Sequence, residues 1–367
     1  MNINNVLDRI ITCGTGSTFY RITNAEGKVW LMPAHNMRTA MELYQPSGRN
    51  GKLLKKWLPW GHWLPMVQRV AHAEKMTCRL SDEVQTLLEQ TFGIKDLEFS
   101  IFCGTPCVHQ KITMQVCQGK QILGYCKFTD SQEIASLFEK ETRTLRLLES
   151  KQMQGQPHAL YCGKLKNDVY GFIQSTEKTR HSEVLHEWSA LHEEFLDSLY
   201  EATKTTLPYE QSDYCKTLES LQEHMEWLPN EVDRNVVKHA YDILTNKWYG
   251  KDVEFSAYHA DFTPWNMFAE NGHLFVFDWE YAQMTYPSML DRYHFFTQTS
   301  IFERHWTADD ITTYMQSADG AWMDRMLYIV YLMDMIARFT MRERGHVTGD
   351  IARSMKLWNE LLQILTQ

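Results

Sequence analysis

The sequence has few residues of the kinds that make long flexible linkers, and it has no cysteine pair with zinc-knuckle spacing. Its 367 residues include 10 prolines and 18 glycines, which leaves no room for long linkers. None of the eight cysteines forms a Cys-x-x-Cys pair, and a chain of this length does not need disulfides to fold. We therefore expect cytosolic thiols and no zinc cluster, even at Cys103, Cys107, Cys117 and Cys126, which lie close together.

Positive charge and long apolar runs are also in short supply. Lysine and arginine total 37 against 46 acidic residues, a net charge of −9, so the surface should repel nucleic acid. The first residues have no basic stretch, and Asp8 and Arg9 interrupt their apolar run, so we expect no secretory signal and a cytoplasmic protein. Residues 326–337 form the most apolar stretch, but Asp334 interrupts it and it is shorter than the about 20 residues that span a bilayer. This stretch predicts a buried helix and no transmembrane segment.

The residues that are present predict an α+β chain of two lobes behind an additional N-terminal domain. With 44% hydrophobic residues the chain can form a sizeable core, and its length suggests two or three folded units. We expect boundaries near residues 95 and 175. They give an accessory domain over 1–95, an N-terminal lobe over 96–175, and a mainly helical lobe with a helical C-terminus over 176–367.

After residue 95 the spacing of apolar residues changes to every second residue. Alternating apolar residues predict three antiparallel strands over 97–101, 112–116 and 122–128, followed by a helix over 133–150 and a strand over 169–174. Helical patterns dominate after residue 175, with one short strand; the predicted segments are helices at 182–202, 231–248 and 351–365 and the strand at 274–277. Sheet followed by helix argues for two lobes, and ligands commonly bind in the cleft between lobes.

Polar side chains cluster in the segment around residue 260. His259, Asp261 and Asn266 lie in one short stretch, and an apolar strand then leads directly to Asp278. Carboxylate and amide oxygens are hard ligands, which Mg²⁺ prefers together with phosphate oxygens and water. Asn266 and Asp278 suit that role, and Asp261 would face a nucleophile.

This pattern resembles the catalytic and metal-binding loops of the protein-kinase-like fold, and within it the aminoglycoside phosphotransferase and choline kinase family. The motif is His-x-Asp-x-x-x-x-Asn, then an apolar strand and Asp. Ala260 stands where most regulated protein kinases have Arg, and Trp279-Glu280 replaces Phe-Gly, which favours a small-molecule kinase. The resemblance covers roughly residues 96 to 345 and implies Asp261 as the catalytic residue, with Asn266 and Asp278 binding Mg²⁺.

The resemblance also implies a nucleotide site in the N-terminal lobe. Lys127 lies on the third predicted strand and would contact the phosphates, with Glu141 as its partner and Glu139 as the competing one. Gly104 and Thr105 would belong to the loop over the phosphates, and the adenine would lie near Gln174 and Thr176.

Three further residues are expected to support the site. His259 should brace the loop backbone, and Asp291 resembles a family residue that anchors the same loop. Glu280 is either a third metal ligand or a salt-bridged or substrate-facing residue.

The predicted function is therefore an ATP- and Mg²⁺-dependent transfer of the γ-phosphoryl group to a hydroxyl of a small molecule. A sugar or a polysaccharide or glycolipid precursor is the favoured acceptor, and an aminoglycoside or choline-like amino alcohol is the alternative. A nucleotide-binding pseudokinase scaffold is the alternative from another class. GTP as donor and the oligomeric state stay open.

A basic, tryptophan-rich run over 51–65 stands apart from these motifs. It contains Lys52, Lys55, Lys56, Trp57, Trp60 and Trp63. We expect a solvated helix end with tryptophan packed beneath it; the alternative is peripheral contact with anionic glycolipid or membrane headgroups.

Overall fold

The computed structural model describes residues 3–46, 48–107 and 109–367, which divide into two compact units. Unit 1 comprises Met1–Ser150, Gln154–Glu183 and Phe268–Glu280, and unit 2 comprises the remaining segments. Each unit is described by itself. In the described part of the chain no helix combines the length and the apolar character needed to cross a membrane.

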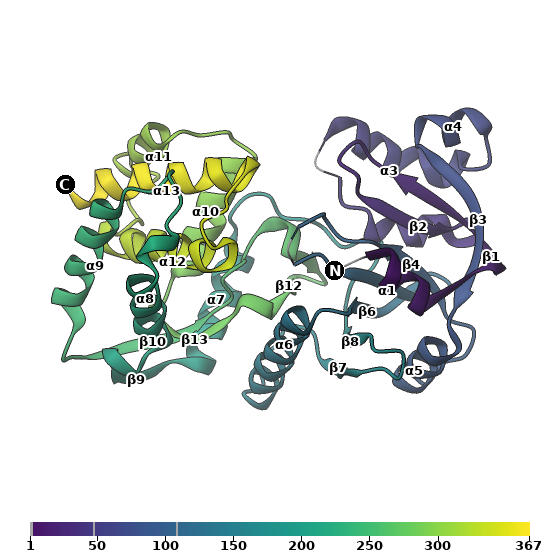
Figure 1. The fold of residues 1–367 in the computed structure, drawn as a ribbon, viewed down its shortest axis with the longest axis horizontal. Coiled ribbons are helices and arrows are strands. Elements are labelled where there is room, and N and C mark those ends of the chain that lie inside the picture. Colours follow the sequence, from purple (N-terminus) through teal and green to yellow (C-terminus); the bar gives the residue numbers. More distant parts are fainter. Residues whose placement is uncertain (1–2, 47, 108) are drawn as a thin grey trace. The chain divides into compact units, whose positions relative to one another are not determined.

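Unit 1 is built on one antiparallel sheet of eight strands (Figure 1). The strand order is β3-β1-β2-β4-β5-β6-β8-β7. The strands are β1 (Ile11–Thr23), β2 (Val29–Pro33), β3 (Ala73–Leu80), β4 (Glu98–Phe102), β5 (Ile112–Gln118), β6 (Gln121–Thr129), β7 (Ala159–Lys164) and β8 (Tyr170–Ser175). The helices of this unit are α1 (Ile3–Ile10), α2 (Met37–Ala40), α3 (Arg49–Gly61), α4 (Pro65–Val70), α5 (Asp82–Phe92) and α6 (Gln132–Ser150), and a hairpin is formed by β11 (Met267–Glu270) and β12 (His273–Val276).

The first 95 residues share this sheet with the segment that follows them. Strand β2 pairs with β4 through Trp30 opposite Phe102 and Leu31 opposite Ile101, so β1, β2 and β3 extend the sheet. The division therefore differs from the predicted accessory domain over 1–95, because β2 and β4 hydrogen-bond directly. Deleting the first 95 residues would expose the edge of β4.

Unit 2 is mainly helical and packs around α12 (Arg325–Glu343). Residues 328–337 of α12 are all buried, as the apolar sequence predicts, and α8, α9, α10 and α13 contact it (Figure 1). The remaining helices are α7 (Ala190–Thr203), α8 (Asp213–Glu223), α9 (Arg234–Trp248), α10 (Leu290–Phe302), α11 (Ala308–Met315) and α13 (Gly349–Thr366). A sheet of order β13-β10-β9 completes the unit: β9 (Thr205–Pro208), β10 (Asp252–Tyr258) and β13 (Gln283–Tyr286).

Two predictions for residues 176–367 are wrong. Strands β9, β10 and β13 and the β11–β12 hairpin form where one short strand was expected. The helix expected from residue 182 begins at Ala190, because Ser189 caps it in a capping box with His192. The segment between β10 and β11 carries His259, Asp261 and Asn266.

Candidate active site

In unit 1, Lys127 lies between two carboxylates. Its Nζ is 2.7 Å from Glu141 Oε2 on α6 and 2.6 Å from Asp278 Oδ1, just after β12. Strand β6 presents Lys127 on the buried face of the sheet, and α6 turns Glu141 inward while Glu139 is exposed. Glu141 is therefore the residue that pairs with Lys127.

The charges of this pair depend on each other. Burial alone would lower the pKa of Lys127, but Asp278 and Glu141 more than offset it, so its pKa is raised and the amine is charged. Burial raises the pKa of Glu141, and Lys127 opposes that shift. Glu141 Oε1 also accepts a hydrogen bond from the backbone N–H of Trp279, at 3.2 Å. Glu141 thus links the helix, the lysine and the segment after Asp278.

A second lysine belongs to the same group of charges. Lys111, just before β5, forms an ion pair with Glu280 and lies 3.8 Å from Asp278. Sequence reasoning missed it, although a cation just before the strand that pairs with β6 was a usable signal. We call Lys111, Lys127, Glu141, Asp278 and Glu280 the lysine–carboxylate cluster. Glu280 is thus salt-bridged, one of the alternatives left open above.

The cluster has the donor atoms that a hard cation requires. Oxygen atoms of Glu141, Asp278 and Glu280 all lie within 4.8 Å of one another. The cluster contains two lysines and three carboxylates. Asp278 is the most exposed of the three carboxylates, with 27% of its side chain exposed. Asp278 also has a positive φ of 69°, a backbone conformation that few non-glycine residues adopt. These residues fit a divalent metal such as Mg²⁺.

The predicted nucleotide-contacting residues lie on the same unit. Gly104 has φ +75°, and a Cβ there would lie 2.3 Å from the carbonyl oxygen of Lys111, so the turn beside Lys111 requires glycine. Thr105 is exposed next to it.

Gln174 shares a sheet face with Lys127. Strand β8 places Phe172 opposite Lys127 and Gln174 opposite Tyr125, two residues along each strand. The Oε1 atom of Gln174 is buried and has no hydrogen-bond partner among the described residues. The hydroxyl of Thr176 accepts a hydrogen bond from the backbone N–H of Lys178, at 3.1 Å. Gln174 therefore offers an unused acceptor on the lysine's face of the sheet.

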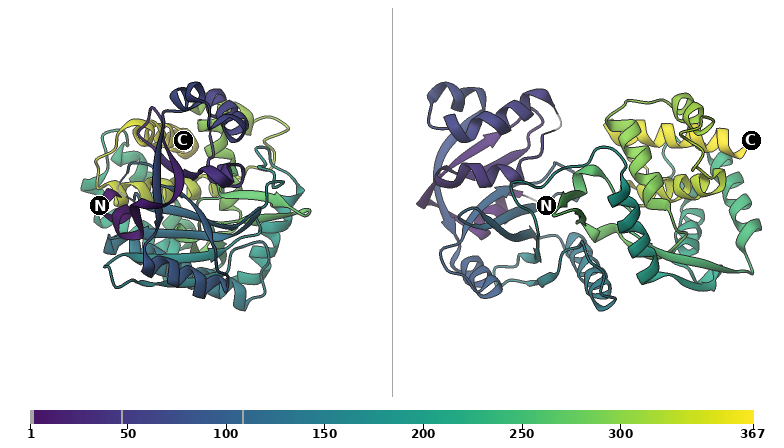
Figure 2. Two further views of the ribbon diagram at one scale, coloured as in Figure 1. Left: turned by 90° about the vertical axis from the view of Figure 1, so that its right-hand side faces the viewer. Right: turned by 180° about the vertical axis from the view of Figure 1, so that it is seen from behind.

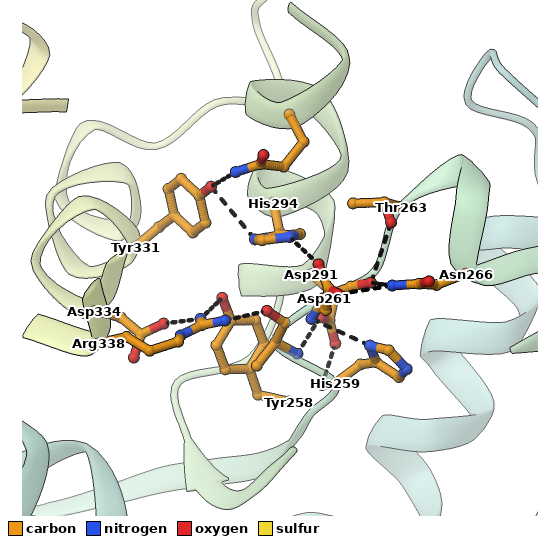
Figure 3. Close-up of polar contacts among 12 residues, drawn as sticks. Tyr258, His259, Asp261, Thr263, Asn266, Asp291, His294, Tyr331, Asp334 and Arg338 are labelled. Atoms are coloured by element: carbon orange, nitrogen blue, oxygen red, sulfur yellow. Dashed lines mark hydrogen bonds and ion pairs between the residues drawn. The ribbon is translucent and has the colours of Figure 1, made fainter. Parts of the chain in front are cut away.

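In unit 2, the loop after β10 is held by its backbone (Figure 3). Buried Asp291, at the start of α10, accepts hydrogen bonds from the backbone N–H groups of His259, at 2.8 Å, and Ala260, at 3.1 Å. His259 is fully buried, and its Nδ1 accepts the N–H of Asp261, at 3.2 Å. These bonds give His259 and Asp291 the positions expected of structural braces. Ala260 has φ +71°, so the bonds hold a strained turn.

The carboxylate of Asp261 is positioned from two sides (Figure 3). Asn266 Nδ2 donates to Asp261 Oδ2 at 2.7 Å and to the Asp261 carbonyl at 3.0 Å. His294 on α10 places its Nε2 3.3 Å from Asp261 Oδ1, and its Nδ1 is 3.4 Å from the hydroxyl of Tyr331. Burial lowers the pKa of His294 and keeps the ring neutral near pH 7. A neutral ring can then accept from Tyr331 and donate to Asp261.

Sequence reasoning missed His294 and Arg338. Arg338 on α12 donates to the carbonyl oxygen of Ala260, is 3.3 Å from the hydroxyl of Tyr258, and pairs with Asp334 at 2.5 Å. Both residues lie on helices far along the chain from residue 260, so spacing gives no signal for them. The usable signal was chemical, because a buried helix that carries Asp334 and Arg338 must satisfy their charges.

The two groups of residues can perform complementary chemistry. The cluster of unit 1 offers cations for phosphate oxygens and carboxylates for a metal. Unit 2 offers a fixed carboxylate, Asp261, which is only partly exposed and can accept a proton.

Comparisons with known proteins identify the fold. No protein family model matches the chain, and no curated protein matches it in sequence. Among solved structures, the chain is similar to a thermostable mutant of aminoglycoside phosphotransferase APH(4)-Ia in its apo form, with a TM-score of 0.51 and 16% identity over 77% of this chain and 99% of that one. For a ternary complex of such a mutant with ADP and hygromycin B, the TM-score is 0.50 and the identity is 15%, over 76% of this chain and 98% of that one. For choline kinase LicA from Streptococcus pneumoniae, the TM-score is 0.48 and the identity is 15%, over 76% of this chain and 98% of that one. The chain therefore has the protein-kinase-like fold that its motifs predicted.

Proposed function

We propose that this protein is an ATP-dependent kinase that transfers the γ-phosphoryl group to a hydroxyl of a small molecule. The observation that carries the proposal is the environment of Asp261. Its carboxylate is oriented by Asn266 and His294, on a loop whose backbone is fixed by Asp291 and Arg338. A surface carboxylate without a catalytic task has no need of such positioning.

Asp261 is assigned the proton of the acceptor hydroxyl. As that proton moves to the carboxylate, the acceptor oxygen forms a bond to the γ-phosphorus and the bond to the leaving ADP oxygen breaks. His294 keeps the carboxylate oriented, and its neutral ring adds no positive charge that would lower the basicity of Asp261. Positioning of this kind can lower the barrier without any covalent step on the protein.

The lysine–carboxylate cluster is assigned to the nucleotide. Lys127 would contact the phosphates, and Lys111 supplies a second cation that can be released from Glu280 to do the same. Asp278 and Asn266 would hold Mg²⁺, which neutralises phosphate charge when bound. The Nδ2 of Asn266 is engaged by Asp261, which leaves its Oδ1 as the atom suited to a cation.

The base of the nucleotide is assigned to the region of Gln174 and Thr176, with Gly104 and Thr105 close to the phosphates. The unpartnered Oε1 of Gln174 supports this, because an exocyclic amino group is a donor that would satisfy it. Guanine could use the same acceptor differently, so competition between ATP and GTP is the direct test of donor choice.

For the acceptor we favour a sugar or a polysaccharide or glycolipid precursor. The exposed aromatic rings and cations of unit 1 suit an anionic glycolipid surface, which would bring the protein to an acceptor of that class. An aminoglycoside or choline-like amino alcohol is the second candidate. The net charge of −9 suits cationic acceptors, and one similar structure is described as a complex with ADP and hygromycin B.

A nucleotide-binding scaffold without activity is the alternative from another class. Retention of Lys127, Asp261, Asn266 and Asp278 argues against it, since a scaffold needs no proton acceptor. A thermal shift with ATP and Mg²⁺ tests binding first, because a ligand at 100 times its Kd adds about 2.7 kcal/mol of stability.

The decisive experiment is a screen for phosphorylated product. Sugars, aminoglycosides and amino alcohols are incubated with ATP, Mg²⁺ and the protein, and the products are identified by mass spectrometry. The Asp261→Asn variant is the matched control. We expect a product that requires Mg²⁺ and wild-type protein; nucleotide binding without any product across the panel would favour the scaffold.

A further inference from the structure

The helices α3 and α4 of unit 1 carry an unusual concentration of exposed apolar side chains. Half of the exposed large hydrophobic residues in the described part of the chain lie between residues 53 and 70. They are Leu53, Trp57, Trp60, Trp63, Leu64, Met66 and Val70. We call these seven residues the α3–α4 patch. The tryptophans were expected to pack beneath the helix, and that prediction is wrong: Trp57, Trp60 and Trp63 are 61%, 65% and 63% exposed.

The exposed apolar residues of α3 lie on one side of the helix. Leu53, Trp57 and Trp60 follow one another at spacings of four and three residues, which puts them on one side of the helix. The opposite side bears Leu54 and Leu58, which pack into the core beneath. The exposed side chains are therefore presented by a helix that is anchored from behind.

Helix α4 is anchored in the same way. Val67 packs against the same core, while Met66 and Val70 are 79% and 69% exposed. Gln68 Nε2 donates to the carbonyl of His62 at 2.8 Å and to the hydroxyl of Tyr20 at 3.2 Å, which ties the helix junction to β1. Both helices lie at the same edge of unit 1 in the views of Figures 1 and 2. The patch is a fixed surface of this unit.

Positive charge surrounds the patch. Residues 49–70 include five basic and no acidic residues, in a chain of net charge −9. Arg49, Lys52 and Lys56 are exposed on α3, and Lys56 lies over the ring of Trp57, 5.7 Å from its centroid. Arg38 lies over the ring of Trp60 at 5.4 Å. Lysine and arginine beside exposed tryptophan are the composition of helices that lie in the headgroup region of a bilayer.

We propose that the α3–α4 patch binds the surface of an anionic lipid bilayer. Basic side chains would contact the headgroups, and tryptophan, leucine, methionine and valine would enter the boundary with the acyl chains. A second copy of this chain is a poor occupant, because two faces with the same positive charge repel. A polysaccharide or nucleic acid would satisfy the cations and rings but would leave Leu53, Met66 and Val70 without an apolar partner. This inference does not rest on the proposed kinase activity.

Vesicle flotation tests the proposal with the whole 367-residue chain. One set of vesicles is phosphatidylcholine alone, and the other has equal parts of phosphatidylcholine and phosphatidylglycerol. We expect flotation with the anionic vesicles, a blue shift of tryptophan fluorescence on binding, and weakening at high salt. Absence of wild-type protein from the anionic vesicle fraction would overturn the proposal.

Two double variants and two controls locate the surface. Lys52→Glu with Lys56→Glu should reduce partition by more than about tenfold, since each basic residue near an anionic surface contributes about fivefold. Trp57→Ser with Trp60→Ser should reduce the blue shift and leave only the part due to Trp63. The controls alter exposed residues of unit 2: Lys238→Glu with Lys356→Glu for charge, and Tyr249→Ser for an exposed ring.

The other outcomes of these experiments also support or overturn the assignment of the patch. The lysine variant touches no core residue, so thermal melting should be unchanged and a loss of partition reports the surface itself. Equal partition of patch and control variants would overturn the assignment of the patch. So would self-association through the patch in light scattering, or binding to dextran sulfate without binding to vesicles.

Discussion

The lysine–carboxylate cluster of unit 1 and the 259–266 loop of unit 2 hold their charged groups in different ways. In the cluster, charged side chains neutralise one another, and Lys127 is shared between Glu141 and Asp278. At the loop, backbone N–H groups donate to Asp291 on α10, and Asp261 is held by an amide and a neutral imidazole. An ion-paired cluster can exchange partners when phosphates arrive, whereas backbone hydrogen bonds fix a position. We infer that the cluster of unit 1 can rearrange around a bound ligand, whereas the loop of unit 2 fixes the direction of the Asp261 carboxylate.

The largest effect on activity is expected from a substitution of Asp261. Replacement by Asn keeps the shape of the side chain but cannot take a proton, so turnover should fall by about a hundred- to ten-thousandfold. Acceptor-dependent ADP release measures the effect. Turnover close to wild type would remove Asp261 from the proposed mechanism.

The next largest effect is expected at Glu141. A Gln amide cannot accept from Lys127 and from the Trp279 N–H at once, so one donor would face another in a buried site. Leaving a buried charge without a partner costs about 3 to 5 kcal/mol; because Asp278 still pairs with Lys127, we expect Glu141→Gln to lower the free energy of unfolding by less than that.

Glu139→Gln is the matched control for this experiment. It is on the same helix but exposed, and its stability in urea should stay within about 0.5 kcal/mol of wild type. Equal stability of the two variants would show that the Lys127–Glu141 pair contributes nothing measurable.

A smaller effect is expected at His294. His294→Phe removes the Nε2 donor to the Asp261 carboxylate and should lower kcat by at least about tenfold, because a hydrogen bond to a charged group contributes about 1.5 to 3 kcal/mol, with KM for ATP unchanged. His294→Gln restores a donor and should recover part of the loss. If Phe and Gln behave alike, the ring acts through packing and does not orient Asp261.

The smallest effect is expected in the pH dependence of stability, through Asp291, which anchors the loop. Burial raises the pKa of Asp291 from 3.8 to about 7, although the N–H groups of His259 and Ala260 oppose the shift. The folded protein therefore binds this proton more tightly than the unfolded chain, so the contribution of Asp291 to stability falls as pH rises from about 4 to about 7.

Asp291→Asn does not titrate and serves as the reference. Between those pH values, the unfolding free energy of wild type should fall by at least about 1 kcal/mol relative to the variant. Parallel pH profiles for the two proteins would contradict the raised pKa.

Local patterns predicted much of unit 1. The alternation in β4, β5 and β6 and the spacing in α6 located Lys127 and Glu141, because strand and helix periods fix which side chains face the core. In unit 2 the motif from His259 to Asn266 gave the loop, and the apolar stretch gave the buried helix α12.

The residues that were missed act over long sequence distances. His294 and Arg338 reach the loop from α10 and α12, and no local period reports that packing. The strand β10 was missed because it pairs with β9 and β13, which are short and distant in sequence. Exposure of Trp57 and Trp60 also ran against expectation, since large apolar residues are usually buried.

One titration tests the division of roles most directly. ATP with Mg²⁺ is titrated calorimetrically into wild type, Asp261→Asn and Lys127→Met. We expect Asp261→Asn to bind within about 1 kcal/mol of wild type, because it loses only a nearby charge that does not touch the nucleotide. Lys127→Met should bind at least about tenfold more weakly, because the phosphates lose a fixed cation. Unchanged affinity in Lys127→Met, or a collapse of binding in Asp261→Asn, would contradict the account.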